Sequence, residues 1–325
     1  MFERRGADGG EVPRLVAIET TSRCNASCSF CPYSAKTTAK SAMDQALFEK
    51  IIEDCRAFPL AKIEPLLNGE PFVDPRIVAR LEHIKRRLPR SILHLVTNGN
   101  AMLPKRIDEV AAIGGVDRLI VSLNTLDAQS YRDVMDLDLA RTLENLHYLL
   151  DPVRRDRVAR RIYVRMVRRP DSTLAEQDRF LAFCRQQRVR AMIVGQHNYT
   201  GDVDSELPVP AYPCQMLDRV DILHDGRVAL CCSDPEGKHS WGDVRTHSVL
   251  EVFRGAVAQR YRDLHRRGQR STIEPCNSCS IIWPDLTGMP IGRTMKTAAE
   301  FAAYLVRHRP LGRHAPKRRN NRASE

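Results

Sequence analysis

Short apolar runs alternate with longer amphipathic segments from Pro13 to about Gly195. The short runs predict strands over Leu15–Thr20, Lys62–Leu67, Ile92–Thr97, Arg118–Leu123, Ile162–Val167 and Ala191–Gly195. Three- and four-residue apolar spacing and a helix start after Asp74-Pro75 predict helices over Ala46–Phe58 and Arg76–Arg87, followed by Pro104–Ile113, Leu139–Leu150 and Leu174–Gln187. This alternation predicts an α/β fold with a parallel sheet and helices outside it, either an open stack or a barrel.

The pattern changes after Gly195. Residues 196–213 contain Gly201 and three prolines, which is typical of a linking segment. Asp225-Gly226 then separates the apolar stretches Val220–Leu223 and Arg227–Leu230, and this arrangement predicts a β-hairpin. One helix is expected over Ser248–Arg266. We therefore expect an N-terminal extension (1–13), a core domain (14–200), a small second domain (201–290) and a tail (291–325).

Composition places the chain among ordinary globular proteins. Its 325 residues suit one large domain or two modest ones, and 42% of them are hydrophobic. No apolar run approaches the ~18 residues of a membrane-spanning helix. The N-terminus lacks the apolar segment of a signal peptide, so we expect a cytoplasmic protein without membrane partners.

The positive charge is concentrated at the C-terminus. Lys and Arg exceed Asp and Glu by 51 to 40, a net charge of +11, and the last 25 residues carry seven of the basic residues and one acid, or +6. A solvated tail accounts for this excess. With only 6% aromatic residues the chain offers no evident stacking platform, so a nucleic-acid partner is not expected.

Ten cysteines are the strongest chemical signal. Eight fall into two groups, namely Cys24, Cys28 and Cys31 near the N-terminus and five residues between Cys214 and Cys279. In a chain without an export signal such clusters indicate metal or redox chemistry rather than disulfides. Cys55 and Cys184 fall in the apolar patterns of two predicted helices and are expected in the core.

The first group has the spacing C-x3-C-x2-C and follows the first predicted strand directly. Thiolates are soft ligands that suit an iron–sulfur cluster or zinc. Three thiolates on a 4Fe–4S cluster leave one iron open to an external ligand. The alternative is a zinc site with a distant fourth ligand.

At this point the sequence resembles the radical S-adenosylmethionine (SAM) superfamily, over roughly residues 14–200. The signature is the cysteine loop with Phe30 before its third cysteine. Further resemblance lies in Asn68-Gly69-Glu70-Pro71, similar to the family's GGEP motif, in Thr97-Asn98-Gly99, and in Ser122 and Asn124 at the end of the fourth strand. The resemblance implies a partial (β/α)6 TIM-like barrel, with these segments contacting SAM at the carboxyl ends of the strands. Simple capping of the strand end is the alternative for Ser122 and Asn124.

The resemblance also implies the chemistry. SAM would bind the open iron, and one electron from a donor such as flavodoxin or ferredoxin would release a 5′-deoxyadenosyl radical. That radical abstracts a hydrogen atom from the substrate, while the protein positions the target and excludes water.

The second group contains Cys214, Cys231, Cys276 and Cys279, which could fully ligate a second 4Fe–4S cluster. The order Cys, Gly-x4-Cys and C-x2-C resembles the SPASM and twitch extensions of radical SAM enzymes, as does Trp241-Gly242-Asp243-Val244. No cysteine follows Cys279, so we expect one auxiliary cluster; four-cysteine zinc is the alternative. Cys232 could replace Cys231 as ligand, pack as a bystander, or donate a hydrogen atom.

Three reactions remain open from the sequence. The cysteine pattern is similar to that of the radical SAM dehydrogenases of aminocyclitol biosynthesis, so oxidation of an alcohol carbon in a small sugar- or cyclitol-like metabolite ranks first, with the auxiliary cluster as electron acceptor. Epimerisation with Cys232 as hydrogen donor resembles aminoglycoside epimerases and ranks second. Modification of a ribosomal peptide ranks third. Enzymes of that kind often carry an added peptide-binding domain, whereas only 13 residues precede the first strand here. Arg165 is a candidate for binding the substrate, and His197 and Tyr199 are candidate proton acceptors.

Overall fold

The computed structural model describes residues 12–205 and 207–281 and five separate residues between 295 and 306. Its strands are β1 (Leu15–Ile18), β2 (Lys62–Glu64), β3 (Ile92–Thr97), β4 (Arg118–Ser122), β5 (Ile162–Arg168), β6 (Arg190–Gly195), β7 (Arg219–Ile222), β8 (Arg227–Ala229) and β9 (Gly242–Asp243). The helices are α1 (Gln45–Cys55), α2 (Ile77–Arg87), α3 (Pro104–Ala112), α4 (Ala128–Met135), α5 (Leu139–Leu150), α6 (Arg155–Val158), α7 (Leu174–Gln186), α8 (Val249–Arg254) and α9 (Ala256–Arg266).

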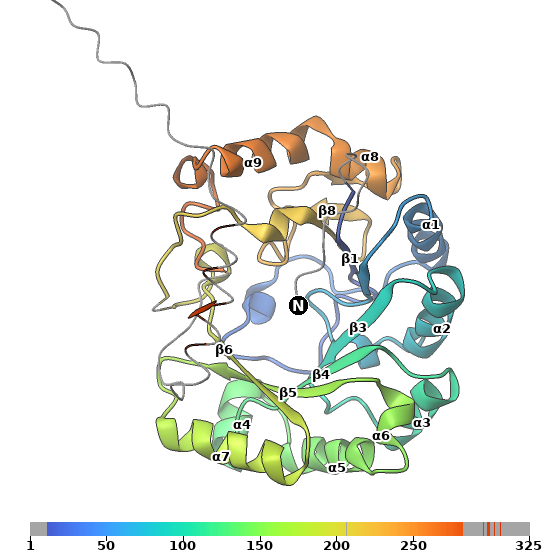
Figure 1. Cartoon of the computed structure of the whole chain (residues 1–325), viewed down its shortest axis with the longest axis vertical. Coiled ribbons are helices and arrows are strands. Elements are labelled where there is room, and N and C mark those ends of the chain that lie inside the picture. Colours follow the sequence, from blue (N-terminus) through green and yellow to red (C-terminus); the bar gives the residue numbers. More distant parts are fainter. Residues whose placement is uncertain are drawn as a thin grey trace, which may run out of the picture.

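The strands form one sheet in the order β6-β5-β4-β3-β2-β1-β7-β8-β9. Strands β1 to β7 run parallel, and the sheet curves into a partial barrel with the helices on its outside (Figure 1). The expected partial barrel with its small C-terminal segment is therefore confirmed. All six core strands and five of its helices lie where the hydrophobic pattern predicts them, with ends shifted by up to three residues.

The two faces of the barrel differ in polarity because side chains alternate along each strand. Ile63, Leu93 and Leu95 point outward into the core beneath the helices and are almost fully buried. Glu64 and His94, their neighbours in sequence, therefore point into the barrel. The outer core also contains Cys55 and Cys184, as predicted, with 0% and 1% of their surfaces exposed.

The predicted hairpin forms across Asp225-Gly226, with β7 antiparallel to β8. Strand β7 also pairs in parallel with β1, so the second cysteine segment begins as a seventh strand of the barrel sheet. Gly226 has a φ of 94°, a left-handed conformation that glycine adopts without strain. The hairpin thereby carries Cys231 back along β7, away from the carboxyl end of that strand.

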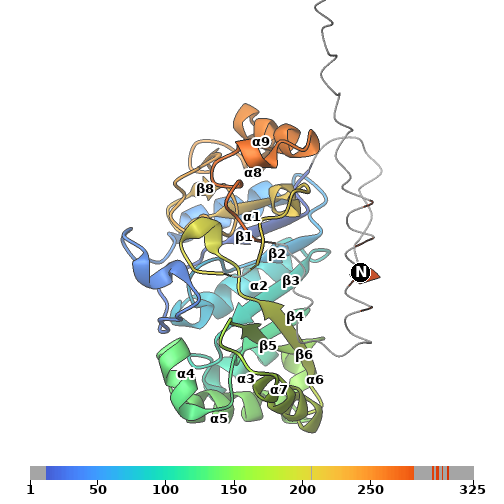
Figure 2. The same ribbon diagram turned by 90° about the vertical axis from the view of Figure 1, so that its left-hand side faces the viewer.

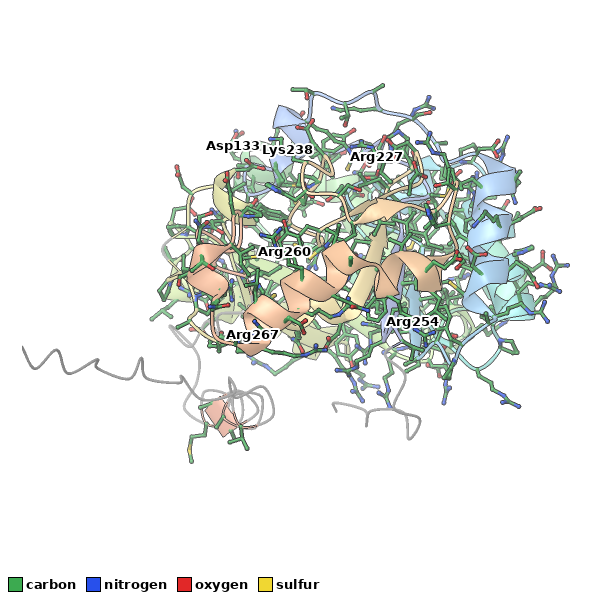
Figure 3. All side chains as sticks on the ribbon, turned by 90° about the horizontal axis from the view of Figure 1, so that it is seen from above. Asp133, Arg227, Lys238, Arg254, Arg260 and Arg267 are labelled. Carbon is green, nitrogen blue, oxygen red and sulfur yellow. The ribbon has the colours of Figure 1, made fainter. Side chains whose placement is uncertain are left out.

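The prediction of one helix over Ser248–Arg266 is wrong. The segment forms two helices, because Gly255 adopts an extended conformation between α8 and α9. Ser248 begins α8 with a capping box, donating to and accepting from Glu251. Helix α9 buries Ala258 and His265, while Arg260 and Arg267 are exposed on the outer face of this layer (Figure 3).

Candidate functional site

The first cysteine group lies in the loop after β1, which Figure 2 shows at the same end of the barrel as α4. Tyr33 fixes the start of this loop, because its hydroxyl accepts from the Cys24 amide at 2.7 Å and donates to the Cys24 carbonyl at 3.3 Å. The Ala26 amide points at Cys24 Sγ at 3.4 Å, and Met135 Sδ lies 3.6 Å from Cys28 Sγ. These contacts fix the conformation of the loop.

Three asparagines connect this loop to the segment after β3. Asn98 donates to the Asn25 side chain at 2.8 Å, and Asn25 in turn donates to the Asn100 side chain at 3.1 Å. Asn98, predicted as a SAM contact, therefore supports the cysteine loop through its Nδ2, while its Oδ1 accepts from the Asn100 amide within the segment after β3. Asn25 and Asn100 gave no signal in the sequence.

The Asn68-Gly69-Glu70-Pro71 segment packs directly beneath the cysteine loop. A Cβ on Gly69 would lie 2.0 Å from the Thr21 carbonyl oxygen, so only glycine allows this approach. The Glu70 carboxylate accepts from Thr97 Oγ1 at 2.7 Å and from the Asn98 amide at 2.7 Å, joining the two strand-end motifs. Burial raises the pKa of Glu70 to about 7.

The other predicted SAM contacts differ in whether their side chains already have hydrogen-bond partners. Asn68 Nδ2 is buried and has no hydrogen-bond partner in the described part of the chain, so it could donate to a bound ligand. Ser122 Oγ accepts from Arg165 at 2.8 Å. Asn124 is engaged within the fold, because its side chain accepts from the Val167 amide at 2.9 Å and contacts Met135 Sδ. Phe30 is half-buried against the core.

Burial disfavours the thiolate forms of the first cysteine group. It raises the pKa of Cys24 to about 12 and raises the pKa values of Cys28 and Cys31 as well. Cluster binding would therefore displace protons. Among the described residues no three His, Cys, Asp or Glu side chains converge closely enough to hold a single metal ion. This geometry suits a cluster, in which each thiolate binds a different iron, better than it suits zinc.

The second group brings together the predicted residues Cys214, Cys231, Cys276 and Cys279. All four thiols are buried or half-buried, and burial raises the pKa of Cys276 to about 11. Cys214 interacts electrostatically with Cys276 and Cys279, and Cys231 interacts with Cys214 and Cys279. The amides of Ser233 and Ile281 point at the sulfurs of Cys231 and Cys279, at 3.4 and 3.5 Å. These are the contacts expected around a fully ligated cluster.

Arg270 anchors this group and was not identified from the sequence. Its buried guanidinium donates to the carbonyls of Cys276 at 3.2 Å and Cys279 at 2.7 Å. The positive charge also favours the thiolate forms of Cys214 and Cys276. His265 Nδ1 accepts from the Cys214 amide at 3.1 Å, and burial, together with Arg270, lowers the pKa of His265 to about 4.

Three predicted residues lie between the two cysteine groups. Arg165 interacts electrostatically with Tyr199 and with Cys28 and Cys31 of the first group. Tyr199 interacts with the same groups and with Cys232, which follows the second-group residue Cys231. Cys232 Sγ lies 3.9 Å from Met216 Sδ, and burial raises its pKa to about 12. Arg165 and Tyr199 therefore connect the two cysteine groups electrostatically inside the barrel.

The segment that carries Tyr199 is held by both loops of the second group. Asn198 donates to the Ser278 carbonyl at 2.5 Å and accepts from the Ser280 amide at 2.9 Å, on either side of Cys279. Thr200 Oγ1 donates to the Ser233 carbonyl at 3.2 Å. Tyr199 and Thr200 have φ values of 45° and 65°, strained for non-glycine residues and typical of functional sites. His197 is half-buried beside them.

No helix in the described residues is long and apolar enough to cross a membrane.

The sequence comparisons define the class. Residues 18–165 match the radical SAM superfamily, and residues 214–280 match the SPASM iron–sulfur cluster-binding domain. The chain therefore belongs to the radical SAM superfamily and carries a SPASM domain, so that it is a radical SAM enzyme whose cofactors are SAM and iron–sulfur clusters.

Two curated proteins illustrate the similarity. The chain is 26% identical to the S-adenosyl-L-methionine-dependent 2-deoxy-scyllo-inosamine dehydrogenase of Niallia circulans over 268 residues, which cover 82% of this chain and 92% of that protein. It is 34% identical over 114 residues to the tungsten-containing aldehyde ferredoxin oxidoreductase cofactor-modifying protein of Pyrococcus furiosus. That second alignment covers 35% of this chain and only 31% of the relative.

Solved structures agree on the fold. BtrN in complex with AdoMet and 2-DOIA superimposes with a TM-score of 0.60 at 18% identity, covering 83% of this chain and 94% of BtrN. Streptococcus suis SuiB bound to its precursor peptide SuiA gives a TM-score of 0.66 at 14% identity, covering 83% of this chain and 70% of SuiB. These likenesses support the partial barrel with its C-terminal cluster-binding segment.

Proposed function

We propose that this protein is a SAM-dependent dehydrogenase that oxidises an alcohol carbon of a small sugar- or cyclitol-like metabolite. The observation that carries the proposal is that Tyr199 interacts electrostatically with cysteines of both groups and with Arg165. The nearly end-to-end alignment with the 2-deoxy-scyllo-inosamine dehydrogenase supports the same reaction class.

In this proposal Cys24, Cys28 and Cys31 hold the SAM-binding cluster. The auxiliary cluster is held by Cys214, Cys231, Cys276 and Cys279. When bound, the first cluster and SAM supply the radical that removes a substrate hydrogen atom, and the auxiliary cluster supplies an electron acceptor. A flavodoxin or ferredoxin is the proposed source of the starting electron.

The protein residues bind and orient the substrate. Arg165 is held by Ser122 at 2.8 Å, and its buried Nε has no hydrogen-bond partner in the described part of the chain, so it can donate to a substrate oxygen. Tyr199 lies between the two cysteine groups, where its ring would help to exclude water from the reacting carbon. Its position, and that of His197 after β6, leave both as candidate proton acceptors.

Epimerisation is the second candidate, and the position of Cys232 favours it. Cys232 is not needed to complete a set of four ligands if Cys231 serves, and its thiol interacts electrostatically with Tyr199 and with Arg219 on the barrel wall. Burial keeps this thiol protonated, which is the form that donates a hydrogen atom.

Product analysis in D2O separates the two reactions. Holoenzyme with SAM, a reductant and 2-deoxy-scyllo-inosamine as the probe should form a ketone and 5′-deoxyadenosine in equal amounts. Cys232→Ala should retain ketone formation. An epimer carrying deuterium, lost in Cys232→Ala, would replace the dehydrogenase proposal with the epimerase.

A further inference from the structure

A second polar group lies deeper in the barrel than Arg165. It consists of Glu64 on β2, His94 on β3, and Arg219 and Asp221 on β7. Each alternates with an outward apolar residue, so all four side chains point into the barrel. Glu64 and Asp221 are register neighbours of Ala17 on β1, one on each side. The small Ala17 side chain leaves room for the Arg219 guanidinium to reach both carboxylates.

Hydrogen bonds connect Arg219, Glu64 and His94 in series. Arg219 pairs with Asp221 and donates to Glu64 Oε2 at 3.4 Å. The other Glu64 oxygen, Oε1, lies 2.6 Å from His94 Nδ1. An ionised Glu64 can only accept, so Nδ1 carries the hydrogen and donates it.

The protonation states follow from burial and charge. Burial alone would raise the pKa of Glu64, but the hydrogen bond from His94 and the charges of Arg219 and Lys62 hold it below its usual range. Burial lowers the pKa of His94 and outweighs the effect of Glu64. The imidazole is therefore neutral, and its Nε2 carries a lone pair.

That Nε2 is the unexplained atom. It is buried and has no hydrogen-bond partner among the described residues. Buried polar atoms without a partner are uncommon in native proteins and concentrate at sites of function. Glu64, which orients the ring, interacts electrostatically with Arg165 at the first cysteine group and with Cys232 at the second. Through Glu64, the pair is thus linked electrostatically to residues beside both cysteine groups.

We infer that His94, oriented by Glu64, accepts the hydroxyl proton of the substrate. The inference rests on the proposed dehydrogenase function and assigns the base within it to His94, in place of the candidates His197 and Tyr199. Glu64 is a positioning residue, since it fixes the tautomer that leaves Nε2 free to accept.

The step balances with the partners already named. When bound, the first cluster and SAM would supply the removal of one hydrogen atom from the carbon that bears the hydroxyl, and the oxidised auxiliary iron–sulfur cluster would accept one further electron. His94 Nε2 would accept the O–H proton. The O–H bond breaks, a carbon–oxygen double bond forms, and the substrate has lost two electrons and two protons overall.

The first test reads the tautomer and needs no substrate. In holoenzyme labelled with 15N-histidine, the His94 resonances, assigned by their loss in His94→Gln, should show a protonated Nδ1 and an unprotonated Nε2 at pH 7.5. Glu64→Gln can donate to Nδ1 and should move the hydrogen to Nε2. A wild-type imidazole that is doubly protonated, or protonated at Nε2, would overturn the inference.

The second test measures the proton transfer. With 2-deoxy-scyllo-inosamine as probe, His94→Gln should lower ketone formation by about 100- to 10,000-fold, the range of general base catalysis. SAM cleavage should persist. His147→Gln, an exposed histidine on α5, is the matched control and should match the wild type.

The pH profile excludes a purely structural role. The charged groups that act on His94 are Glu64 and Lys62 on β2 and Arg118 on β4, and Arg219 acts through Glu64. Wild-type ketone formation should fall on acidification as Nε2 becomes protonated, below the ordinary histidine value of 6.5. This acidic limb should be absent in His94→Gln, and its persistence there would refute the assignment.

The two proposals fail separately. If the wild type yields an epimer instead of a ketone, the dehydrogenase proposal falls and the role of His94 as base in ketone formation falls with it. If the ketone forms but His94→Gln retains the wild-type rate and acidic limb, only the assignment of His94 is wrong.

Discussion

Single residues of the first site tolerate little change, and Gly69 is the clearest case. Gly69→Ala would place its Cβ 2.0 Å from the Thr21 carbonyl and 2.8 Å from that of Arg23, just before Cys24. The backbone must move to relieve this overlap. We therefore expect the variant to lose the iron of the first cluster and to lose SAM binding, while it keeps the iron of the second cluster. Iron analysis and SAM titration test this, and a variant with wild-type iron and affinity would contradict it.

His265 makes the second site sensitive to acid. Because its folded pKa of about 4 lies below the ordinary value of 6.5, the neutral form contributes stability above pH 6.5 that is lost as the pH falls toward 4. The full loss is about 3 kcal/mol, at 1.36 kcal/mol per pKa unit. Denaturation midpoints of wild type and His265→Gln, which can still accept from Cys214, should converge on acidification. Parallel pH dependence of the two proteins would contradict this account.

At this scale the sequence predicts ligands better than it predicts their supports. Cys24 and Gly69 belong to local motifs, and motif spacing is visible in any sequence. The Glu70 carboxylate meets Thr97 only because β2 and β3 are neighbours, and Arg270 reaches the carbonyls of Cys276 and Cys279 only through the fold of a polar loop. Such partners depend on tertiary structure and leave no periodic pattern.

Among the elements, the strained turn after β6 is tied to the loops of the second cysteine group. Asn198→Ala removes two side-chain hydrogen bonds to the residues flanking Cys279. We expect the peptide that contains residues 198–200 to exchange its amide hydrogens about tenfold faster, equivalent to about 1.4 kcal/mol, because both bonds hold this left-handed turn against the loop around Cys279. Hydrogen exchange followed by mass spectrometry measures this.

The control is Asn277→Ala, an exposed residue of the same loop, which should leave the exchange of residues 198–200 unchanged. Equal exchange in Asn198→Ala and wild type would mean that other contacts hold Tyr199 in place.

Element boundaries show where the hydrophobic pattern loses information. The strand Ile92–Thr97 and the helix Leu139–Leu150 match the prediction at both ends, since each combines a strong hydrophobic pattern with clear turn or capping residues. The break at Gly255 could not be predicted, because a single glycine is tolerated within a helix and the apolar spacing continues past it.

On the scale of the whole molecule, buried charges join the cysteine loop to the C-terminal hairpin. Lys36 Nζ lies 3.3 Å from Glu19 Oε1, with both side chains almost fully buried, and His224 at the hairpin contacts Glu19 Oε2 at 3.0 Å. The sequence predicted the hairpin but not its docking on β1, because a strand does not encode its partner locally.

Glu19→Gln should therefore destabilise the whole protein. It leaves Lys36 buried without its counter-charge, a loss of about 3–5 kcal/mol for a buried pair. Anaerobic chemical denaturation measures it, with Glu49→Gln on the exposed face of α1 as the control, expected to change stability by less than about 1 kcal/mol. Equal midpoints for Glu19→Gln and wild type would contradict this coupling.

The central claim is that each of the two cysteine groups holds a 4Fe–4S cluster. Iron and acid-labile sulfide in anaerobically reconstituted protein test it most directly. Two such clusters require about eight irons and about eight sulfides per chain, falling to about four of each in Cys276→Ala. About four irons in the wild type, unchanged in Cys276→Ala, would contradict the claim.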